Sequence, residues 1–247
     1  VPHMYWSEKE DCQNLNIWTP SIRDGRKRPV MVWLHGGGFS AGSSIEQLAY
    51  DGENLSRAGD VVVVSVNHRL NVLGYLDLSP FGEKYQDSAN AGNLDLIAAL
   101  EWIRDNIEGF GGDPENVTLF GQSGGGVKVW SLLQMPEADG LFHKGIIESG
   151  VVDPDLLGDT EDGNGREVVK AMLAELGLEE KDVDQLETLP YDQLAQAYEN
   201  AAPKVAQKGE YVGNHPHKNQ SYFGDAIKHG FREETKKIPL LIGTVLG

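Results

Sequence analysis

Ser123 stands in a pattern of residues that is typical of a serine nucleophile. The run "NVTLFGQSGGG", residues 116–126, alternates apolar positions and then enters a cluster of glycines, with Gly121 and Gly125 two positions to either side of the serine. A predicted strand before the motif and a predicted helix after it are the context in which G-x-S-x-G forms a tight, strained turn, and side chains at the flanking positions would clash there. The N-terminus of the following helix favours developing negative charge. We predict that Ser123 is a nucleophile; the alternative is a plain glycine turn.

A second glycine cluster could stabilise the charge that such a nucleophile creates. "HGGGF", residues 35–39, follows the predicted strand "PVMVWLHG", and its consecutive glycines leave backbone N–H groups unshielded. Such groups can donate to the oxyanion of a tetrahedral intermediate, and we choose Gly37 and Gly38 as donors, with the N–H of Gly124 as the third. A phosphate loop would need the spacing G-x-x-x-x-G-K-[ST], and no lysine follows this loop. We assign His35 a structural role in holding the loop.

The segments that must position these residues alternate between strand-like and helix-like patterns, which indicates a parallel sheet covered by helices. Apolar runs predict strands at "LNIWTP" (15–20), "PVMVWLHG" (29–36), "DVVVVSVNHR" (60–69), "NVTLFGQS" (116–123), "GIIESG" (145–150) and "IPLLIGT" (238–244). The β-branched run over 60–69 looks the most central. Helical spacing predicts helices over 88–107 and directly after Ser123. The expected class is α/β, with a mostly parallel sheet and helices on both faces.

An acidic stretch after Gly150 changes the character of the chain. Residues 153–235 are expected to form a helical, cap-like insertion, with amphipathic helices at roughly 165–176 and 191–202. Two interpretations stay open: a cap that shapes a pocket, and a solvated helical excursion without substrate contact. No linker divides the chain, so residues 1–247 are expected to form one domain.

Composition limits the partners of the chain. The formal net charge of −17 and the lack of a basic patch exclude nucleic acid as an expected partner, because phosphate binding needs clustered Lys and Arg. No apolar run approaches the roughly 20 residues that span a bilayer, so we expect no membrane partner. The single cysteine, Cys12, and the lack of a signal sequence favour a cytoplasmic location. A secreted protein stays open, because the N-terminus looks incomplete.

Several stretches resemble, in order, the sequence blocks of the type-B carboxylesterases, the cholinesterase-like and para-nitrobenzyl-esterase-like branch of the α/β hydrolases. They are "EDCQNLNIWTP", "VMVWLHGGGFSAGS", "NHRLNVLGYL", "GNLDLIAALEWIRDNIEGFGGDPENVTLFGQSGGG", "LFHKGIIESG" and "IPLLIGT". The resemblance covers most of the chain to Gly150 and then the last predicted strand. It implies an α/β-hydrolase fold and a serine carboxylic-ester hydrolase that acts on a small-molecule ester through an acyl-enzyme on Ser123, with an HGGG-type oxyanion hole and no cofactor.

The resemblance also implies roles for individual residues. Ser149 would lie close to the catalytic triad and help to hold its acid. Gly124 replaces the family's usual alanine and leaves the N–H donor intact. Cys12 matches a cysteine that is disulfide-bonded in secreted members, but its upstream partner is missing.

The acid and the histidine of the triad are expected beyond Gly247. The family's order is Ser, acid, His, with the acid a few residues past a strand similar to "IPLLIGT", so a continuation of the chain or a second polypeptide would supply both. Asp225 and His229 keep that order within the chain, but their spacing places them on one turn of a predicted helix, whereas triad acids and bases normally come from separate loops. We favour a surface helix pair for these two residues.

Two other features leave alternatives to this assignment. His215 and His217 alternate in "NHPHK" without a nearby carboxylate or cysteine, so we expect a solvated loop and no metal site. A non-catalytic cholinesterase-like binding or adhesion protein and an inactive fragment are the alternatives to an enzyme. The missing acid and histidine favour these alternatives, and the retained serine and oxyanion loop speak against them.

Overall fold

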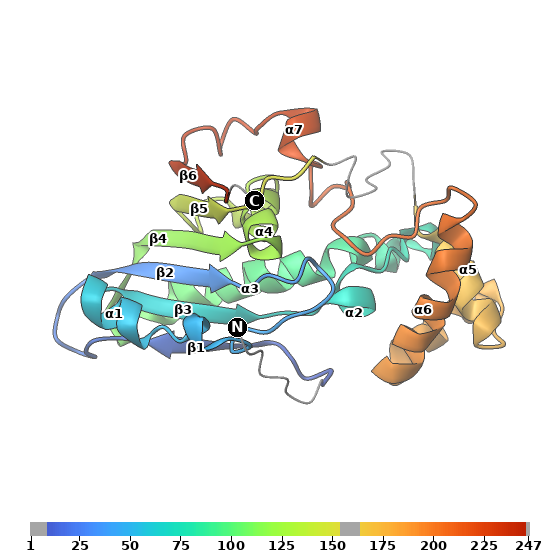
Figure 1. Cartoon of the computed structure of the whole chain (residues 1–247), viewed down its shortest axis with the longest axis horizontal. Helices are drawn as coiled ribbons and strands as arrows, with labels where there is room; N and C mark the ends of the chain where they lie inside the picture. The colour runs from blue at the N-terminus through green and yellow to red at the C-terminus, as the bar shows by residue number, and fades with distance from the viewer. Residues whose placement is uncertain (1–8, 154–163, 246–247) are drawn as a thin grey trace.

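The computed structural model of the chain, which describes residues 9–153 and 164–245, is built on a mostly parallel sheet (Figure 1). The strands within these ranges are β1 (Asn14–Trp18), β2 (Arg28–Leu34), β3 (Val62–Asn67), β4 (Gly112–Gln122), β5 (Lys144–Glu148) and β6 (Leu240–Gly243). Their order is β1-β3-β2-β4-β5-β6, and only β1 pairs antiparallel with its neighbour. The α/β class and the mostly parallel sheet predicted from the sequence are therefore confirmed.

Helices and short 3-10 turns connect these strands. The α-helices in the described part of the chain are α1 (Glu53–Gly59), α2 (Asn71–Tyr75), α3 (Ala91–Asn106), α4 (Gly124–Leu132), α5 (Arg166–Glu175), α6 (Tyr191–Ala206) and α7 (Ala226–His229). The helix predicted over 88–107 is α3 with a 3-10 turn at each end, Ser88–Asn90 and Ile107–Phe110. None of the described helices is both long and apolar enough to cross a bilayer.

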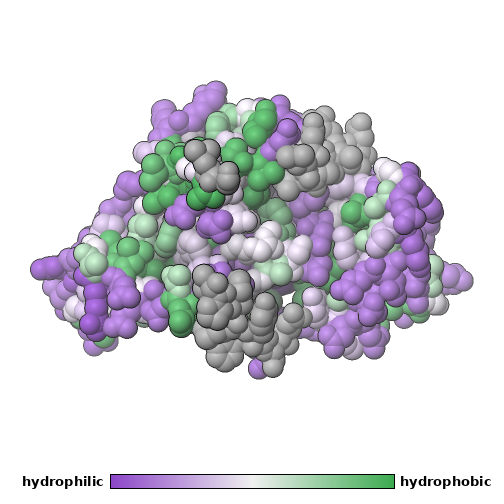
Figure 2. Space-filling view, in the orientation of Figure 1, coloured by the Kyte–Doolittle hydropathy of each residue, from purple (hydrophilic) through white to green (hydrophobic). Residues whose placement is uncertain are grey.

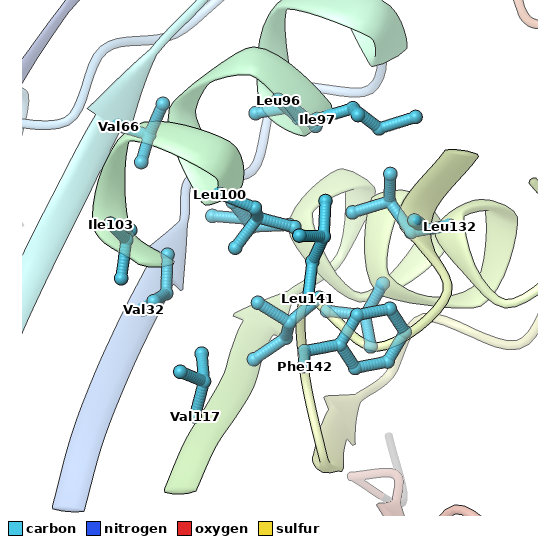
Figure 3. Packing of buried hydrophobic residues seen from close by; sticks show 14 of the residues in the cluster. Val32, Val66, Leu96, Ile97, Leu100, Ile103, Val117, Leu132, Leu141 and Phe142 are labelled. Carbon is cyan, nitrogen blue, oxygen red and sulfur yellow. The ribbon is translucent and has the colours of Figure 1, made fainter. Parts of the chain in front are cut away.

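The main core lies between the sheet and the helices α3 and α4. Leu96, Leu100 and Ile103 recur at helical spacing along α3 and are at most 2% exposed, because this stripe faces the sheet. Figure 3 shows Ile103 beside Val32 of β2, with Leu100 and Leu96 following along α3. The packing fixes α4, and therefore its N-terminus, against the carboxyl ends of the central strands.

The strand β3 lies one position from the edge of the sheet, between β1 and β2. The prediction that this β-branched run is the most central strand was therefore wrong. Val62, Val63 and Val64 are nevertheless almost fully buried, since both faces of the sheet are covered here. A β-branched run therefore indicates that both faces of the strand are buried, and it does not indicate that the strand is central in the sheet.

A second core forms under the helices that follow residue 164. The apolar face of α5, including Val168, Val169 and Met172, is fully buried against α6 and against residues 72–85. The helix predicted to end at 202 continues to Ala206 through Pro203, because Val205 extends the buried stripe of α6. These helices lie beyond the carboxyl ends of the strands, on the right of Figure 1.

The surface is apolar at β6, the last strand in the sheet order. Leu241 and Ile242 are 66% and 51% exposed, and Val245 is exposed as well. Figure 2 shows hydrophobic surface gathered in the upper part of the view, over the region that β6 occupies in Figure 1.

Candidate active site

Ser123 occupies a strained turn between the end of β4 and the start of α4. Its backbone has φ 56° and ψ −125°, a conformation that costs a residue with a side chain on the order of 1–3 kcal/mol. The turn is held by a hydrogen bond from the Ser123 N–H to the Glu148 carbonyl of β5, 2.8 Å, and by one from the Val127 N–H to the Ser123 carbonyl, 3.0 Å. The side chain is exposed at the carboxyl edge of the sheet. A strained turn between a strand and a helix, with an exposed serine, is the geometry that the predicted nucleophile requires.

Glycines around Ser123 allow the backbone of the turn to touch β2. A methyl group on Gly125 would lie 2.0 Å from the Leu34 carbonyl oxygen, and one on Gly121 would lie 2.5 Å from the Gly125 carbonyl carbon. Real Cβ atoms do not approach backbone atoms this closely. Glycine is therefore required at both positions for the packing seen here.

The glycine loop that follows β2 lies over this turn. A methyl group on Gly36 would be 3.7 Å from the Cβ of Ser123, and one on Gly124 would be 2.3 Å from the backbone nitrogen of Gly38. Gly37 has φ 87°, and its carbonyl accepts hydrogen bonds from the N–H groups of Ser40 and Ala41. The structure thus brings Gly38 against Gly124 and Gly36 close to Ser123, with Gly37 between these two loop residues.

Two asparagines hold the far end of the glycine loop. The Asn71 N–H donates to the Phe39 carbonyl, 2.8 Å, and the Asn214 Nδ2 donates to the Asn71 Oδ1, 2.9 Å. Asn71 has φ 53°, which asparagine tolerates better than most residues. Sequence reasoning missed both residues. Asparagine is one of the residues that adopt a positive φ, which is a weak signal for Asn71. No sequence signal relates Asn214 to the glycine loop, which lies far from it in the sequence.

Behind the glycine loop lies a buried polar cluster of His35, His68 and Lys128. The imidazoles of His35 and His68 stack with centroids 5.4 Å apart, since they follow the neighbouring strands β2 and β3. Lys128 of α4 is fully buried, and its Nζ donates to the His35 carbonyl at 2.9 Å. His35 is only 1% exposed, and its Nδ1 lies 2.8 Å from the Gly36 carbonyl oxygen, so the ring packs against the backbone of the loop.

Burial controls the charges in this cluster. It lowers the pKa of His35 to about 3, with the charge of Lys128 as the second cause, and it lowers the pKa of His68 well below its usual range. Both imidazoles are therefore neutral at pH 7. Burial also lowers the pKa of Lys128 to about 7. This side chain has no carboxylate partner within the described ranges.

We expect the stability of the protein to rise with pH above about 7 because of Lys128. The folded pKa of about 7 lies below the ordinary value of 10.5, so between these values the unfolded chain binds a proton that the folded chain has released. Urea denaturation at about pH 7 and about pH 9 measures this in wild type and in Lys128→Met. The free energy of unfolding of the wild type, relative to that of the variant, should increase with pH. Equal changes in both proteins would contradict the expectation.

Ser149 lies at the same edge of the sheet, where β5 ends. Its backbone has φ 49°, its N–H donates to the Gly243 carbonyl at 2.7 Å, and its hydroxyl accepts from the Val245 N–H at 3.4 Å. The residue therefore holds the segment that leaves β6. The resemblance described above predicts that the acid of the catalytic triad follows shortly after β6.

Histidines that follow Ser123 in the sequence are engaged elsewhere. The Asp225 carboxylate caps α7 and accepts from the Trp130 Nε1 at 3.1 Å, and His229 is exposed at the other end of that helix. His143 accepts from the Val117 N–H in the middle of β4, away from the end of the strand that carries Ser123. Within residues 9–153 and 164–245, the Ser123 hydroxyl has no hydrogen bond to a histidine or a carboxylate. The structure therefore does not bring an internal triad together.

The histidines of "NHPHK" pack around one tyrosine. The rings of His215 and His217 lie 5.5 and 5.2 Å from the ring of Tyr211. No group of three metal-ligating side chains is present in the part of the chain that the structure describes. The segment contributes to the site through Asn214, which also lies 3.4 Å from the Ser40 hydroxyl of the glycine loop.

Comparison with known proteins identifies similar chains. The model of the carboxylesterase family matches residues 2–246. The chain is 40% identical to the para-nitrobenzyl esterase of Bacillus subtilis (strain 168), over 96% of this chain and 47% of that protein. It is 51% identical to mouse carboxylesterase 3B over 58% of this chain and 24% of that protein.

Solved structures agree with these sequence matches. An esterase from the anaerobe Clostridium hathewayi, described as able to hydrolyse aliphatic aromatic polyesters, superposes with a TM-score of 0.96 at 58% identity, over 100% of this chain and 49% of that one. A thermophilic para-nitrobenzyl esterase superposes with a TM-score of 0.79 at 38% identity, over 96% of this chain and 48% of that one. The chain spans about half the length of these esterases.

Proposed function

The chain belongs to the carboxylesterase family, and we propose that it carries the nucleophile and the oxyanion hole of a serine carboxylic-ester hydrolase. The observation that carries the proposal is the position of Ser123, which is strained at φ 56° next to Gly36 of the glycine loop, while the following residue, Gly124, packs against Gly38. If this position served only to form a turn, glycine would adopt the positive φ without strain. A serine at this position therefore indicates that its hydroxyl is needed.

The proposed reaction runs through an acyl-enzyme. The Ser123 Oγ attacks the ester carbonyl carbon, the carbonyl electron pair moves to oxygen, and the N–H groups of Gly37, Gly38 and Gly124 donate to the resulting oxyanion. A histidine base takes the serine proton and gives it to the leaving alcohol. Water then hydrolyses the acyl-enzyme by the same route. The proposal places the histidine and its acid after Gly247, with Ser149 holding the strand end from which the acid follows.

The substrate class we propose is a small-molecule ester of a carboxylic acid. The relatives are named for para-nitrobenzyl esters and for aliphatic aromatic polyesters, so an aromatic group next to the ester is a reasonable first probe. Hydrolysis of p-nitrophenyl butyrate by the complete gene product tests the activity. Labelling with a fluorophosphonate, followed by peptide mass analysis, tests the nucleophile. A preparation that neither hydrolyses the ester nor carries the label on Ser123 would favour a binding protein instead.

We propose that the helices of residues 153–235 form a cap beside this site. The support is that α5 and α6 pack on residues 72–85 beyond the carboxyl ends of the strands, and that Asn214 contacts the glycine loop through Ser40 and Asn71. Residues 154–163 of this segment lie outside the described residues.

We expect Gly37→Ala to lower kcat by roughly 10²–10³-fold while KM changes little, because the loss of an aligned oxyanion donor is felt mainly in the transition state. A methyl group on Gly37 would lie 2.3 Å from the Ala41 carbonyl oxygen, and φ 87° is unfavourable for alanine, so the loop must move. Steady-state kinetics with p-nitrophenyl butyrate measure the effect.

Gly140→Ala is the matched control. Gly140 has a similar φ of 76°, but a methyl group there would meet nothing within 4 Å. The control therefore carries the same backbone strain without displacing the loop. Equal losses of kcat in both variants would contradict the role of Gly37.

A further inference from the structure

Lys128 is a fully buried lysine whose position needs an explanation. Moving an ammonium group out of water is costly, and lysine is almost never fully buried without a partner. No ion pair compensates Lys128 within the described ranges, and the one hydrogen bond given by its Nζ goes to the backbone carbonyl of His35. The contact therefore joins the middle of α4 to the point where β2 ends and the glycine loop begins.

The glycines after Ser123 make room for this side chain. Helical side chains tilt toward the N-terminus of their helix, so the stem of Lys128 covers positions three and four residues earlier. Those positions are Gly125 and Gly124, which carry no side chain. A methyl group on Gly125 would lie 3.0 Å from the same His35 carbonyl oxygen that Lys128 binds. The first turn of α4 is thus shaped to let a long side chain reach the start of the loop.

The position of the His35 carbonyl affects the position of the glycine loop. It belongs to the peptide unit that continues into Gly36, the loop residue next to the Cβ of Ser123. Three glycines in a row have no side chains with which to fix their own positions, so backbone contacts must do so. The Asn71 N–H holds the far end at Phe39, and Lys128 holds the near end at His35.

The two imidazoles of the cluster are held by backbone carbonyls. The Nδ1 atoms of His35 and His68 lie 2.8 and 2.9 Å from the carbonyl oxygens of Gly36 and Arg69. Because a carbonyl only accepts, both Nδ1 atoms carry the proton, and His35 thereby adds a second contact to the loop. Each Nε2 is buried with no hydrogen-bond partner in the described part of the chain, so the His35 carbonyl and not an imidazole accepts from Lys128.

We propose that Lys128 is a positioning residue, which holds the His35 carbonyl and so keeps the N–H groups of the glycine loop aligned with the oxyanion formed at Ser123. This role rests on the proposed function, since it matters only if an oxyanion forms there. The side chain does not touch substrate. It acts through the backbone of the loop, from the side opposite to Asn71.

The test is a kinetic comparison of Lys128→Met with wild type in the complete gene product. Methionine keeps the length and apolar stem of the side chain but has no N–H donor. With p-nitrophenyl butyrate we expect kcat to fall about 10- to 100-fold and KM to change less than about threefold. Lys128→Gln retains an N–H donor, so its kcat should lie between those of wild type and Lys128→Met. A glutamine variant no faster than the methionine variant would overturn the proposal.

Val129→Ala is the matched structural control. Val129 is the next residue of α4 and is fully buried in the main core, where it packs beside Gly145 of β5. It should lose stability while kcat stays within about threefold of wild type. An equal loss of kcat in Val129→Ala and Lys128→Met would show that any weakening of α4 suffices and would overturn the proposal.

A double variant adds a readout that a purely structural role would not move. If Lys128 acts through the loop, then Lys128→Met should cost little once Gly37→Ala has already displaced that loop, so the two losses should not add. Additive losses would overturn the proposal. A wild type that fails to hydrolyse the ester, or that hydrolyses it equally well as Ser123→Ala, would instead reject the proposed function.

Discussion

Replacing Ser123 with alanine is expected to lower kcat for p-nitrophenyl butyrate by roughly 10⁴–10⁶-fold, because the acyl-enzyme cannot form without the Oγ nucleophile. The backbone of the elbow should survive, since its hydrogen bonds to Glu148 and Val127 use main-chain atoms only. KM should therefore change little, and the residual rate should reflect the oxyanion donors and binding alone. Steady-state kinetics and fluorophosphonate labelling of the complete gene product measure both effects.

Ser131→Ala controls for the loss of a serine hydroxyl near the site. Ser131 lies on the same helix, is buried, and donates its hydroxyl to the Val127 carbonyl at 2.9 Å. We expect its kcat to stay within about threefold of wild type and its labelling to be unchanged. Hydrolysis by Ser123→Ala at more than about a tenth of the wild-type rate would rule out Ser123 as the nucleophile.

The elements that carry Ser123 and the glycine loop could be predicted from the sequence because burial leaves a direct pattern. Each predicted strand is present within a few residues, and the largest difference is β4, which begins at Gly112 and not at Asn116. The spacing of apolar residues placed α3 and α6 for the same reason. Placing the two glycine motifs at the ends of β2 and β4 then followed from the topology, since parallel neighbours end at the same edge.

The buried polar cluster could not be predicted in the same way. A lysine in a helix is ordinarily a solvent-exposed residue, and its burial here depends on two histidines that follow other strands. The spacing of Lys128 after Gly124 and Gly125 was the available signal, because those glycines leave space where a lysine stem can lie. The contact of Asn214 with Asn71 depends on how a long loop returns to the sheet, and local sequence does not encode such a path.

Some errors share a physical cause with these omissions. The run over 60–69 looked central because both of its faces are apolar, yet coverage by helices produces the same composition in a strand next to the edge. Similarly, Asp225 and His229 were expected to form a surface helix pair, and His229 is exposed. Asp225 is buried instead, because its carboxylate accepts hydrogen bonds from the N-terminus of α7 and from Trp130. The residue type determines which chemistry a side chain can perform, and the packing determines which groups the side chain contacts.

Gly125→Ala is expected to destabilise the protein by about 3 kcal/mol or more, or to prevent folding, because the added methyl group would lie 2.0 Å from the Leu34 carbonyl oxygen and 2.9 Å from its carbon. These atoms cannot move aside cheaply. Leu34 pairs with both β3 and β4 in the interior of the sheet, and Gly126 in the first turn of α4 packs closely against Gly150. Relief of the clash would require the helix to separate from β2, which would also move Lys128 away from the His35 carbonyl.

Gly109→Ala provides the comparison, since a methyl group on Gly109 meets nothing within 4 Å and its φ is not in the left-handed region. We expect its unfolding midpoint in urea to equal or slightly exceed that of wild type, because alanine reduces the entropy of the unfolded chain. Soluble Gly125→Ala with a wild-type midpoint would mean that β2 and α4 can separate without cost. The close backbone approach that places the glycine loop over Ser123 would then be dispensable, and the geometry of the loop would depend on the contacts of Lys128 and Asn71.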